Sequence, residues 1–267
     1  SSTSRGLGDV YKRQQYLSAK KKLGFDKHTQ SVMKAIVVKE GNRNIINEAF
    51  RVLRSNIDFM AGKDSGQNVF MLTSFNPGSG KSFLAMNIAM SFAIKKKRIL
   101  VIDGDLRHGS TSSYVDSPKT GLSDYLGNRV SDWKEIIVKD EKYDNLHIIP
   151  IGTVPPNPTE LLEDGKLATL IEVLRSEYDY IFIDCPPIDI VADAQIIEKL
   201  ADRTVFVVRS GLLDRSMLPE LENIYQEKRF KNLSVILNGT ESAGGRYGYR
   251  YGYRNGYSSY YGNKGKM

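Results

Sequence analysis

The sequence contains one cysteine, three histidines and no long apolar run among its 267 residues. A single cysteine, Cys185, excludes a disulfide framework and fits a reducing compartment, where we expect it to be a small buried packing residue. The histidines show no metal-ligand spacing, so no zinc site is predicted. The most apolar stretch, residues 83–94, is too short to cross a bilayer and has the periodicity of a core helix. The H-R-D, D-F-G and V-A-I-K motifs are also missing, which excludes a eukaryotic-type protein kinase.

The net positive charge of the chain is concentrated at its two ends. Residues 1–35 carry eight Lys/Arg against two acids, and residues 241–267 carry five Lys/Arg against one acid. Of the formal charge of +7, the segment between therefore holds about −3. A DNA-binding body is disfavoured, no nucleic-acid partner is expected, and the body should lack a basic face. The basic ends suit an anionic membrane surface, or serve solubility alone.

The chain divides into three predicted segments. Residues 1–43 are expected to be a basic linker, with residues 1–14 as candidates for non-native sequence, since the chain begins with Ser1 and this opening matches nothing expected of the domain. Residues 44–242 form one domain, and residues 243–267 form a tail. Nothing aliphatic lies between Ala243 and Met267, so the tail cannot offset the entropy of ordering and is predicted to be disordered.

Strands and helices alternate through the domain. The predicted strands are residues 68–74, 98–103, 180–184, 204–209 and 233–238. The predicted helices are residues 44–60, 81–95, 158–178 and 214–230. The strands are apolar throughout, which is typical of strands buried on both faces. The pattern predicts an α/β fold of three layers, with a mainly parallel central sheet and helices on both faces.

A phosphate-binding loop is predicted at "TSFNPGSGKS", residues 73–82, because it follows a strand and opens a helix. Its glycines would turn backbone N–H groups inward, Lys81 would reach the β- and γ-phosphates, and Ser82 would bind Mg²⁺. The usual first glycine is replaced by Phe75. The sequence therefore predicts an ATP site with Mg²⁺, whose expected nucleotide-binding residues are Asn76, Pro77, Gly78, Ser79, Gly80, Lys81, Ser82, Phe83 and Asn238.

Carboxylates follow two further apolar strands. In "ILVIDGDLR", Asp103 and Asp105 follow an apolar strand, and in "YIFID" Asp184 does the same. Parallel strands end on one edge of a sheet, so these groups should meet near the phosphate loop, around Mg²⁺ and an attacking hydroxyl. For any one of these aspartates alone, a structural role in a turn or as a helix cap would be the simpler interpretation.

These motifs, in this order and spacing, resemble the bacterial tyrosine kinases of capsule and exopolysaccharide export. "NPGSGKS" looks like their Walker A loop, "ILVIDGDLR" like their second acidic motif, "IFIDCPP" like their Walker B motif and "EAFRVLR" like their E-x-x-R-x-x-R helix. "GTVPPNPTELL" and "GLSDYL" also fit the family, and the resemblance spans about residues 44–262. It implies an ATP-dependent protein-tyrosine autokinase at the cytoplasmic face of the inner or plasma membrane.

The resemblance also assigns roles to residues. Asp103 would accept the proton of the attacking tyrosine, while Asp105 and Asp184 would hold Mg²⁺ with Ser82. Lys81 would stabilise the transferred phosphoryl group. Arg107 would pair with a phosphate or with a carboxylate, and Asn238 would contact adenine or cap a turn. The phosphate acceptors would be the tail tyrosines Tyr247, Tyr249, Tyr251, Tyr253, Tyr257, Tyr260 and Tyr261.

The family also implies partners. Glu48, Arg51 and Arg54 would join subunits into a homo-oligomeric ring, with eight subunits as the expected number, although surface ion pairs are the simpler role for them. A membrane activator domain, fused or separate, and an opposing tyrosine phosphatase are further expected partners.

Two alternatives compete with the kinase interpretation. A partitioning-type ATPase switch would carry a further lysine five residues before Lys81, where this sequence has Asn76. An Arg- and Tyr-rich nucleic-acid-binding tail is the other, and it lacks support from a basic body.

Overall fold

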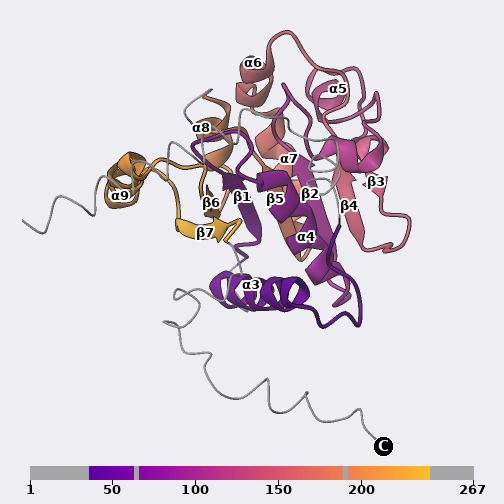
Figure 1. Ribbon diagram of the computed structural model, residues 1–267. Helices are drawn as coiled ribbons and strands as arrows, with labels where there is room; N and C mark the ends of the chain where they lie inside the picture. The colour runs from indigo at the N-terminus through magenta and orange to yellow at the C-terminus, as the bar shows by residue number, and fades with distance from the viewer. Residues whose placement is uncertain (1–35, 63–65, 189–191, 241–267) are drawn as a thin grey trace, which may run out of the picture.

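A seven-stranded sheet forms the centre of the molecule in the computed structural model, which describes residues 36–62, 66–188 and 192–240 (Figure 1). Its strand order is β3-β4-β2-β5-β1-β6-β7. Every pair is parallel except β3 with β4. The strands are β1 Val69–Thr73, β2 Ile99–Asp103, β3 Val138–Lys139, β4 Leu146–Ile149, β5 Tyr180–Asp184, β6 Arg203–Arg209 and β7 Ser234–Asn238.

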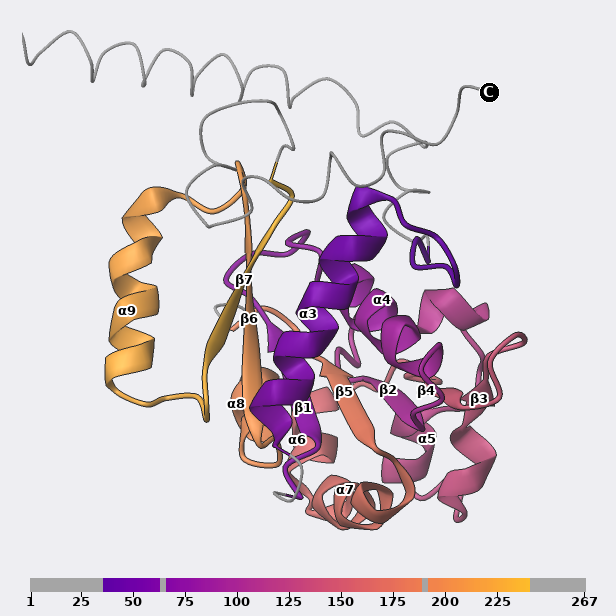
Figure 2. The same cartoon turned by 90° about the horizontal axis from the view of Figure 1, so that it is seen from below.

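Helices cover both faces of this sheet. They are α3 Ile45–Ala61, α4 Lys81–Ala93, α5 Leu122–Leu126, α6 Pro158–Glu163, α7 Lys166–Glu177, α8 Asp193–Glu198 and α9 Leu218–Gln226, with 3₁₀ turns at Ser112–Val115, Trp133–Ile136 and Arg215–Met217. One apolar cluster lies under α3 and α4, and a second lies under α5 to α9 (Figure 2). The α/β prediction of a three-layer, mainly parallel sheet is confirmed.

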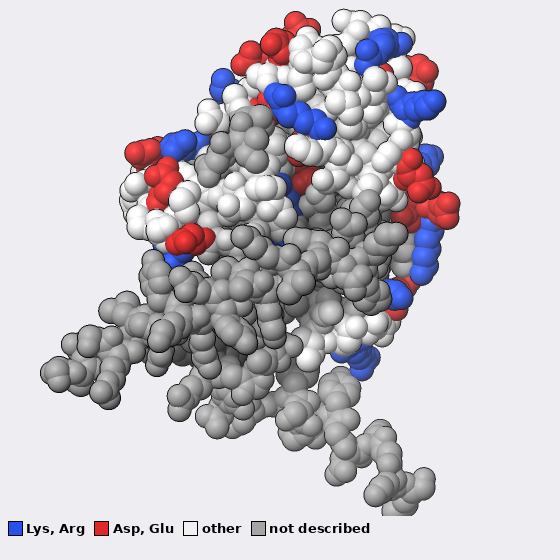
Figure 3. All heavy atoms as spheres, turned by 45° about the horizontal axis from the view of Figure 1, so that its top comes forward, with Lys and Arg blue, Asp and Glu red and all other residues white. Residues whose placement is uncertain are grey.

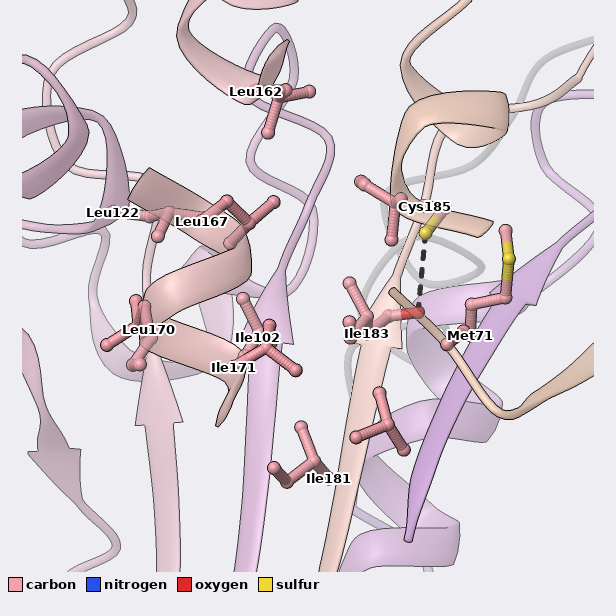
Figure 4. Close-up of a cluster of buried hydrophobic side chains, with 14 of the residues drawn as sticks. Met71, Ile102, Leu122, Leu162, Leu167, Leu170, Ile171, Ile181, Ile183 and Cys185 are labelled. Carbon is pink, nitrogen blue, oxygen red and sulfur yellow. Dashed lines mark hydrogen bonds between the residues drawn. The ribbon is translucent and has the colours of Figure 1, made fainter. Parts of the chain in front are cut away.

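Burial explains the apolar character of the central strands. All residues of β1, β2 and β5 are buried, since these strands are covered on both faces. Figure 4 shows one of these faces, where Leu167, Leu170 and Ile171 of α7 lie against Ile102 of β2 and Ile181 of β5. Cys185 is a buried free thiol in the same cluster, as predicted.

The predicted helix over residues 158–178 is wrong as a single helix. The chain forms α6 and α7 with a break between them, and Gly165 occupies the left-handed region at φ 81°. A left-handed residue cannot continue a right-handed helix, so the glycine ends one helix and precedes the next. The sequence interpretation also omitted β3, β4, α5 and α8, of which β4 adds a full parallel strand beside β2.

Candidate functional site

The loop between β1 and α4 has the backbone of an anion-binding turn. Gly78 and Gly80 have φ of 75° and 94°, which side-chain-bearing residues rarely adopt. A Cβ at Gly80 would lie 2.3 Å from Nδ2 of Asn238, so glycine is required there on two grounds. The loop ends at Lys81, where α4 begins and its first N–H groups have no partner within the helix.

Hydrogen bonds hold the carbonyl groups of this loop from outside. The hydroxyls of Ser74 and Ser79 each donate to the carbonyl of Asn76 at 2.8 Å. Arg209 Nη1 donates to the carbonyl of Gly78 at 2.6 Å, and Asn238 Nδ2 donates to that of Ser79 at 2.9 Å. With its acceptors held in this way, the loop can present its N–H groups to a bound anion.

Asn238 thus supports the loop from the end of β7. Its own Oδ1 accepts from the N–H of Gly239 at 2.8 Å, which is the turn-capping role left open by the sequence. Contact with adenine remains a prediction.

Phe75 explains the departure from the usual loop pattern. Its side chain is 2% exposed and packs edge-on against Phe206 of β6, with ring centroids 4.8 Å apart. At the position of the missing glycine, the chain therefore uses an aromatic core residue that anchors the loop on the sheet.

The side chains that open α4 face the end of β5. The Lys81 ammonium lies 3.4 Å from the Ser74 hydroxyl and is buried. Burial raises the pKa of Asp184, while the nearby Lys81 charge and Ser82 hydroxyl oppose that rise. The structure therefore brings Lys81, Ser82 and Asp184 together at the carboxyl edge of the sheet, where the sequence placed them.

Asp103 and Asp184 are neighbours in register on β2 and β5, and both are buried. Asp103 Oδ2 accepts from the N–H and the hydroxyl of Ser112 at 2.6 and 2.7 Å, and Asp184 Oδ2 accepts from Thr111 at 2.8 Å. Within the described residues, the Oδ1 atom of each has no hydrogen-bond partner. Burial and the adjacent Asp184 carboxylate raise the pKa of Asp103 to about 8.

The remaining acidic-motif residues are held differently. Asp105 Oδ1 accepts from the N–H of Arg107 at 3.3 Å and lies 3.2 Å from His108 Nδ1. Arg107 pairs with a carboxylate, that of Asp193 in α8 at 3.2 Å, and donates to the Thr159 hydroxyl of α6 at 3.0 Å. Arg107 thereby connects the acidic motif to two helices.

Of the two orphaned carboxylate oxygens, Oδ1 of Asp184 fits a magnesium ion bound with a nucleotide. Buried acceptors without donors require a cation or water. Among the described residues there is no group of three or more His, Cys, Asp or Glu arranged to hold a metal unaided. Mg²⁺ is commonly bound through one or two carboxylates, waters and substrate phosphates, so this donor set suits it.

The other predicted residues lie away from this edge or outside the described residues. Glu48 and Arg51 form an ion pair on α3, whereas Arg54 Nη1 donates to the Ser91 carbonyl of α4 at 2.8 Å and so connects two helices of the same chain. All seven tail tyrosines fall in residues 241–267, which are outside the description.

Sequence reasoning missed Thr111, Ser112, Thr159 and Asp193. They reach the site from a loop, a 3₁₀ turn and two helices, and no strand-end pattern marks them. The carboxylate of Asp193 is fully buried and is shared by Arg107 and Thr159. Its place at the start of a short helix was the available signal, and by itself it would indicate only a cap.

Comparison with known proteins supports one family. Residues 67–213 match the family described as an AAA domain. The chain is 34% identical over 210 residues to tyrosine-protein kinase YwqD of Bacillus subtilis, covering 78% of this chain and 87% of that protein. It is also 34% identical over 221 residues to tyrosine-protein kinase CpsD of Streptococcus agalactiae, covering 82% of this chain and 90% of that protein.

Solved structures of known proteins are similar to this chain as well. The kinase domain of Escherichia coli tyrosine kinase ETK superposes with a TM-score of 0.67 at 31% identity, over 76% of this chain and 80% of that one. The chimerical protein CapA2B2 superposes with a TM-score of 0.69 at 33% identity, over 76% and 88%. The septum site-determining protein MinD of Pyrococcus horikoshii, at 23% identity and a TM-score of 0.53, shares the fold.

Proposed function

Because the chain belongs to the bacterial tyrosine kinases of capsule and exopolysaccharide systems, within the AAA domain family, and is a protein-tyrosine kinase, we propose that it phosphorylates its own tail. The γ-phosphoryl group of ATP would pass to tail tyrosines of a neighbouring subunit in a ring. The proposal extends to control of polysaccharide synthesis and export. The observation that carries it is the meeting of Lys81, Asp184 and Asp103 beneath a phosphate-binding loop, in a chain with seven tyrosines in its last 21 residues.

In this proposal, the residues of the site have separate roles in the phosphoryl transfer. The loop and Lys81 would bind and orient the phosphates, and Ser82, Asp105 and Asp184 would hold Mg²⁺ directly or through water. When bound, the ion would neutralise charge on the phosphates. Asp103 accepts the proton of the tyrosine hydroxyl, whose ordinary pKa is near 10. Arg107 keeps the acidic motif in place through Asp193.

The tail suits the role of substrate. Glycine and arginine separate its tyrosines, so each hydroxyl can reach a site that needs no fixed flanking sequence. A membrane activator segment, fused or separate, would supply the link to the cytoplasmic face of the membrane. No helix within the described residues is long and apolar enough to cross a bilayer.

Intact-mass analysis after incubation with Mg·ATP tests this function. The full chain should gain successive phosphates, and a chain truncated after Ala243 should gain none, because it lacks all seven tail tyrosines. If the chain alone shows no turnover, the assay is repeated with an activator segment from a related kinase. ADP release without phosphate on the protein would contradict the proposal and favour the ATPase switch, while phosphate on the truncated chain would place the acceptors elsewhere.

Helix α3 supports the ring part of the proposal. Its exposed side carries Ile45, Val52 and Phe59 at intervals of seven residues, with exposed fractions of 75%, 49% and 87%. Residues spaced by seven lie on one side of a helix, and Glu48 falls on the same side. An apolar stripe of this kind beside the Glu48–Arg51 ion pair suits contact with a second copy.

Substituting this stripe should dissociate the ring. We expect Val52→Glu with Phe59→Glu to convert oligomers to monomers in sedimentation velocity, since two charges would have to be buried unpaired at the contact. The melting temperature should change little because both side chains are exposed. Val173→Glu on α7, also an exposed valine, is the matched control and should leave the oligomer intact. A wild-type chain that is monomeric under activating conditions, or a double variant that stays oligomeric, would contradict the ring.

A further inference from the structure

An open groove of about 790 Å³ lies on the body of the kinase, away from the phosphate loop. We call it the basic groove because five basic side chains line it: Lys96, Arg98, Lys134, Lys139 and Lys142. Aromatic side chains form part of its wall, among them Trp133 and Tyr143. Only two carboxylates, Asp144 and Glu177, lie along it.

This concentration of charge corrects the expectation that the body has no basic face. The body is mildly acidic in total, yet five Lys/Arg and only two carboxylates line this groove. On the face seen in Figure 3, basic and acidic side chains of the described residues are interspersed. The groove instead combines Lys96 and Arg98 with Lys134, Lys139 and Lys142 from a second stretch of sequence.

The cations of the groove are poorly compensated. Lys134, Lys139 and Lys142 have no carboxylate within ion-pair distance in the part of the chain that the structure describes. Lys134 lies over the Trp133 ring at 5.7 Å, and Lys142 over the Tyr143 ring at 5.3 Å. Arg98 approaches Asp179 at the outer limit of an ion pair, 4.0 Å. An anionic ligand would therefore meet three lysines, Lys134, Lys139 and Lys142, that need not first break an ion pair.

The position of the groove separates it from the nucleotide site. Its residues precede β2, surround β3 and β4, and follow α7, so they lie where the parallel strands β2, β4 and β5 begin. The phosphate loop lies where such strands end. In the sheet, β3 is at the edge opposite to β7, after which the tail starts (Figure 2).

We propose that the basic groove binds residues 246–262 of the kinase tail in their phosphorylated form. This inference rests on the proposed autophosphorylation. The unmodified tail, residues 241–267, carries +4 and is repelled by the groove. Each phosphotyrosine adds about −1.5 to −2 charges, so about three phosphates reverse the sign of the tail. The groove thereby distinguishes the reaction product from the substrate, and draws phosphorylated tails away from the catalytic edge.

The shape of the groove favours a peptide over a membrane surface. A bilayer needs a protruding or flat cationic face, whereas this site is concave and its rings are partly buried. Phosphate groups suit the lysine and arginine donors, and tyrosine rings can stack on Trp133 and Tyr143. A phosphotyrosine peptide supplies both groups in one short segment.

Fluorescence anisotropy with a synthetic 246–262 peptide tests the proposal on the full chain without nucleotide. A peptide phosphorylated at Tyr247, Tyr249 and Tyr251 should bind about tenfold more tightly than the unmodified peptide. Lys134→Gln, Lys139→Gln and Lys142→Gln together should weaken binding about tenfold. A control of equal net charge, Lys119→Gln, Lys199→Gln and Lys228→Gln, should bind within about twofold of wild type because these exposed lysines lie outside the groove.

Two kinds of result would overturn the proposal. One is equal binding of the modified and unmodified peptides, or equal loss in the groove and control variants. The other is that phosphatidylserine vesicles or oligothymidylate bind through the groove lysines while the phosphopeptide does not. Chemical synthesis supplies the phosphates, so the peptide result is independent of kinase activity. The intact-mass test in turn does not involve the groove, and the two proposals can fail separately.

Discussion

Lys81→Met is expected to abolish phosphate incorporation into the tail, lowering its initial rate by at least about 10²-fold. Lys81 is a buried cation at the carboxyl edge of the sheet, beside Asp184 and 3.4 Å from the Ser74 hydroxyl. Phosphoryl transfer depends almost entirely on positioning and on charge stabilisation, because little covalent chemistry is left to the protein. Methionine fills similar space and carries no charge, so the change isolates the ammonium group.

The rate is measured by intact mass over time at saturating Mg·ATP. Lys95→Met, at an exposed lysine just after the same helix, is the matched control and should stay within about twofold of wild type. The loss of the ammonium should also raise the pKa of Asp184 further, since the Lys81 charge opposes the effect of burial on that carboxyl. A Lys81→Met protein that keeps more than a tenth of the wild-type rate would rule out this role.

The parts of the fold that sequence predicted are those with strong local signals. The five predicted strands match β1, β2, β5, β6 and β7 within about two residues, because each is an apolar run that ends at a polar turn. The phosphate loop was predicted from its glycines and its position between a strand and a helix. The family assignment followed from the order of several such motifs, and the comparisons confirm it.

What sequence did not predict depends on tertiary contacts or on weak local signals. β4 is short, and His147 interrupts its apolar pattern, so pairing with β2 defines it. Phe75 looked like a defect in a motif and is a core residue. The hydrogen bond from Arg54 to the Ser91 carbonyl was not predicted either, and the interface role of Arg54 stays a prediction. The basic groove combines residues 96–98 with residues 134–142, and the net charge of the body gave no sign of it.

Asp103 should show a conflict between stability and function. It is fully buried, and burial together with the neighbouring Asp184 charge raises its pKa to about 8. The unfolded chain would ionise this group near its ordinary value of about 3.9. Between these two pH values the folded protein holds a proton that the unfolded chain has released, so stability falls as the pH rises through this window.

The rise in pKa from about 3.9 to about 8 sets an upper limit of about 5 kcal/mol on this cost at pH 8, and Asp103→Asn should recover at least about 2 kcal/mol of it, or at least about 4 °C in melting temperature. The asparagine oxygen can still accept from Ser112, and its amide group is neutral beside Asp184. Near pH 4 the gain in stability should largely disappear, because the Asp103 carboxyl is then protonated in the folded protein and about half protonated in the unfolded chain. Calorimetry of both proteins between pH 4 and 8 measures the difference, and a lower melting temperature for the variant at pH 8 would contradict it.

The same substitution should lower tail phosphorylation by about 10²-fold or more, since asparagine cannot accept the tyrosine proton. Asp124→Asn, in helix α5, is the contrasting control. Burial raises the pKa of Asp124, but hydrogen bonds from Thr153, Arg129 and Gly121 outweigh it and lower the pKa overall. Its stabilisation is present above the unfolded pKa, so that variant should be less stable at pH 8. If the Asp103→Asn protein gains stability and loses turnover, the Asp103 carboxyl destabilises the folded state and is required for catalysis. Full turnover in that variant would assign proton acceptance to another group.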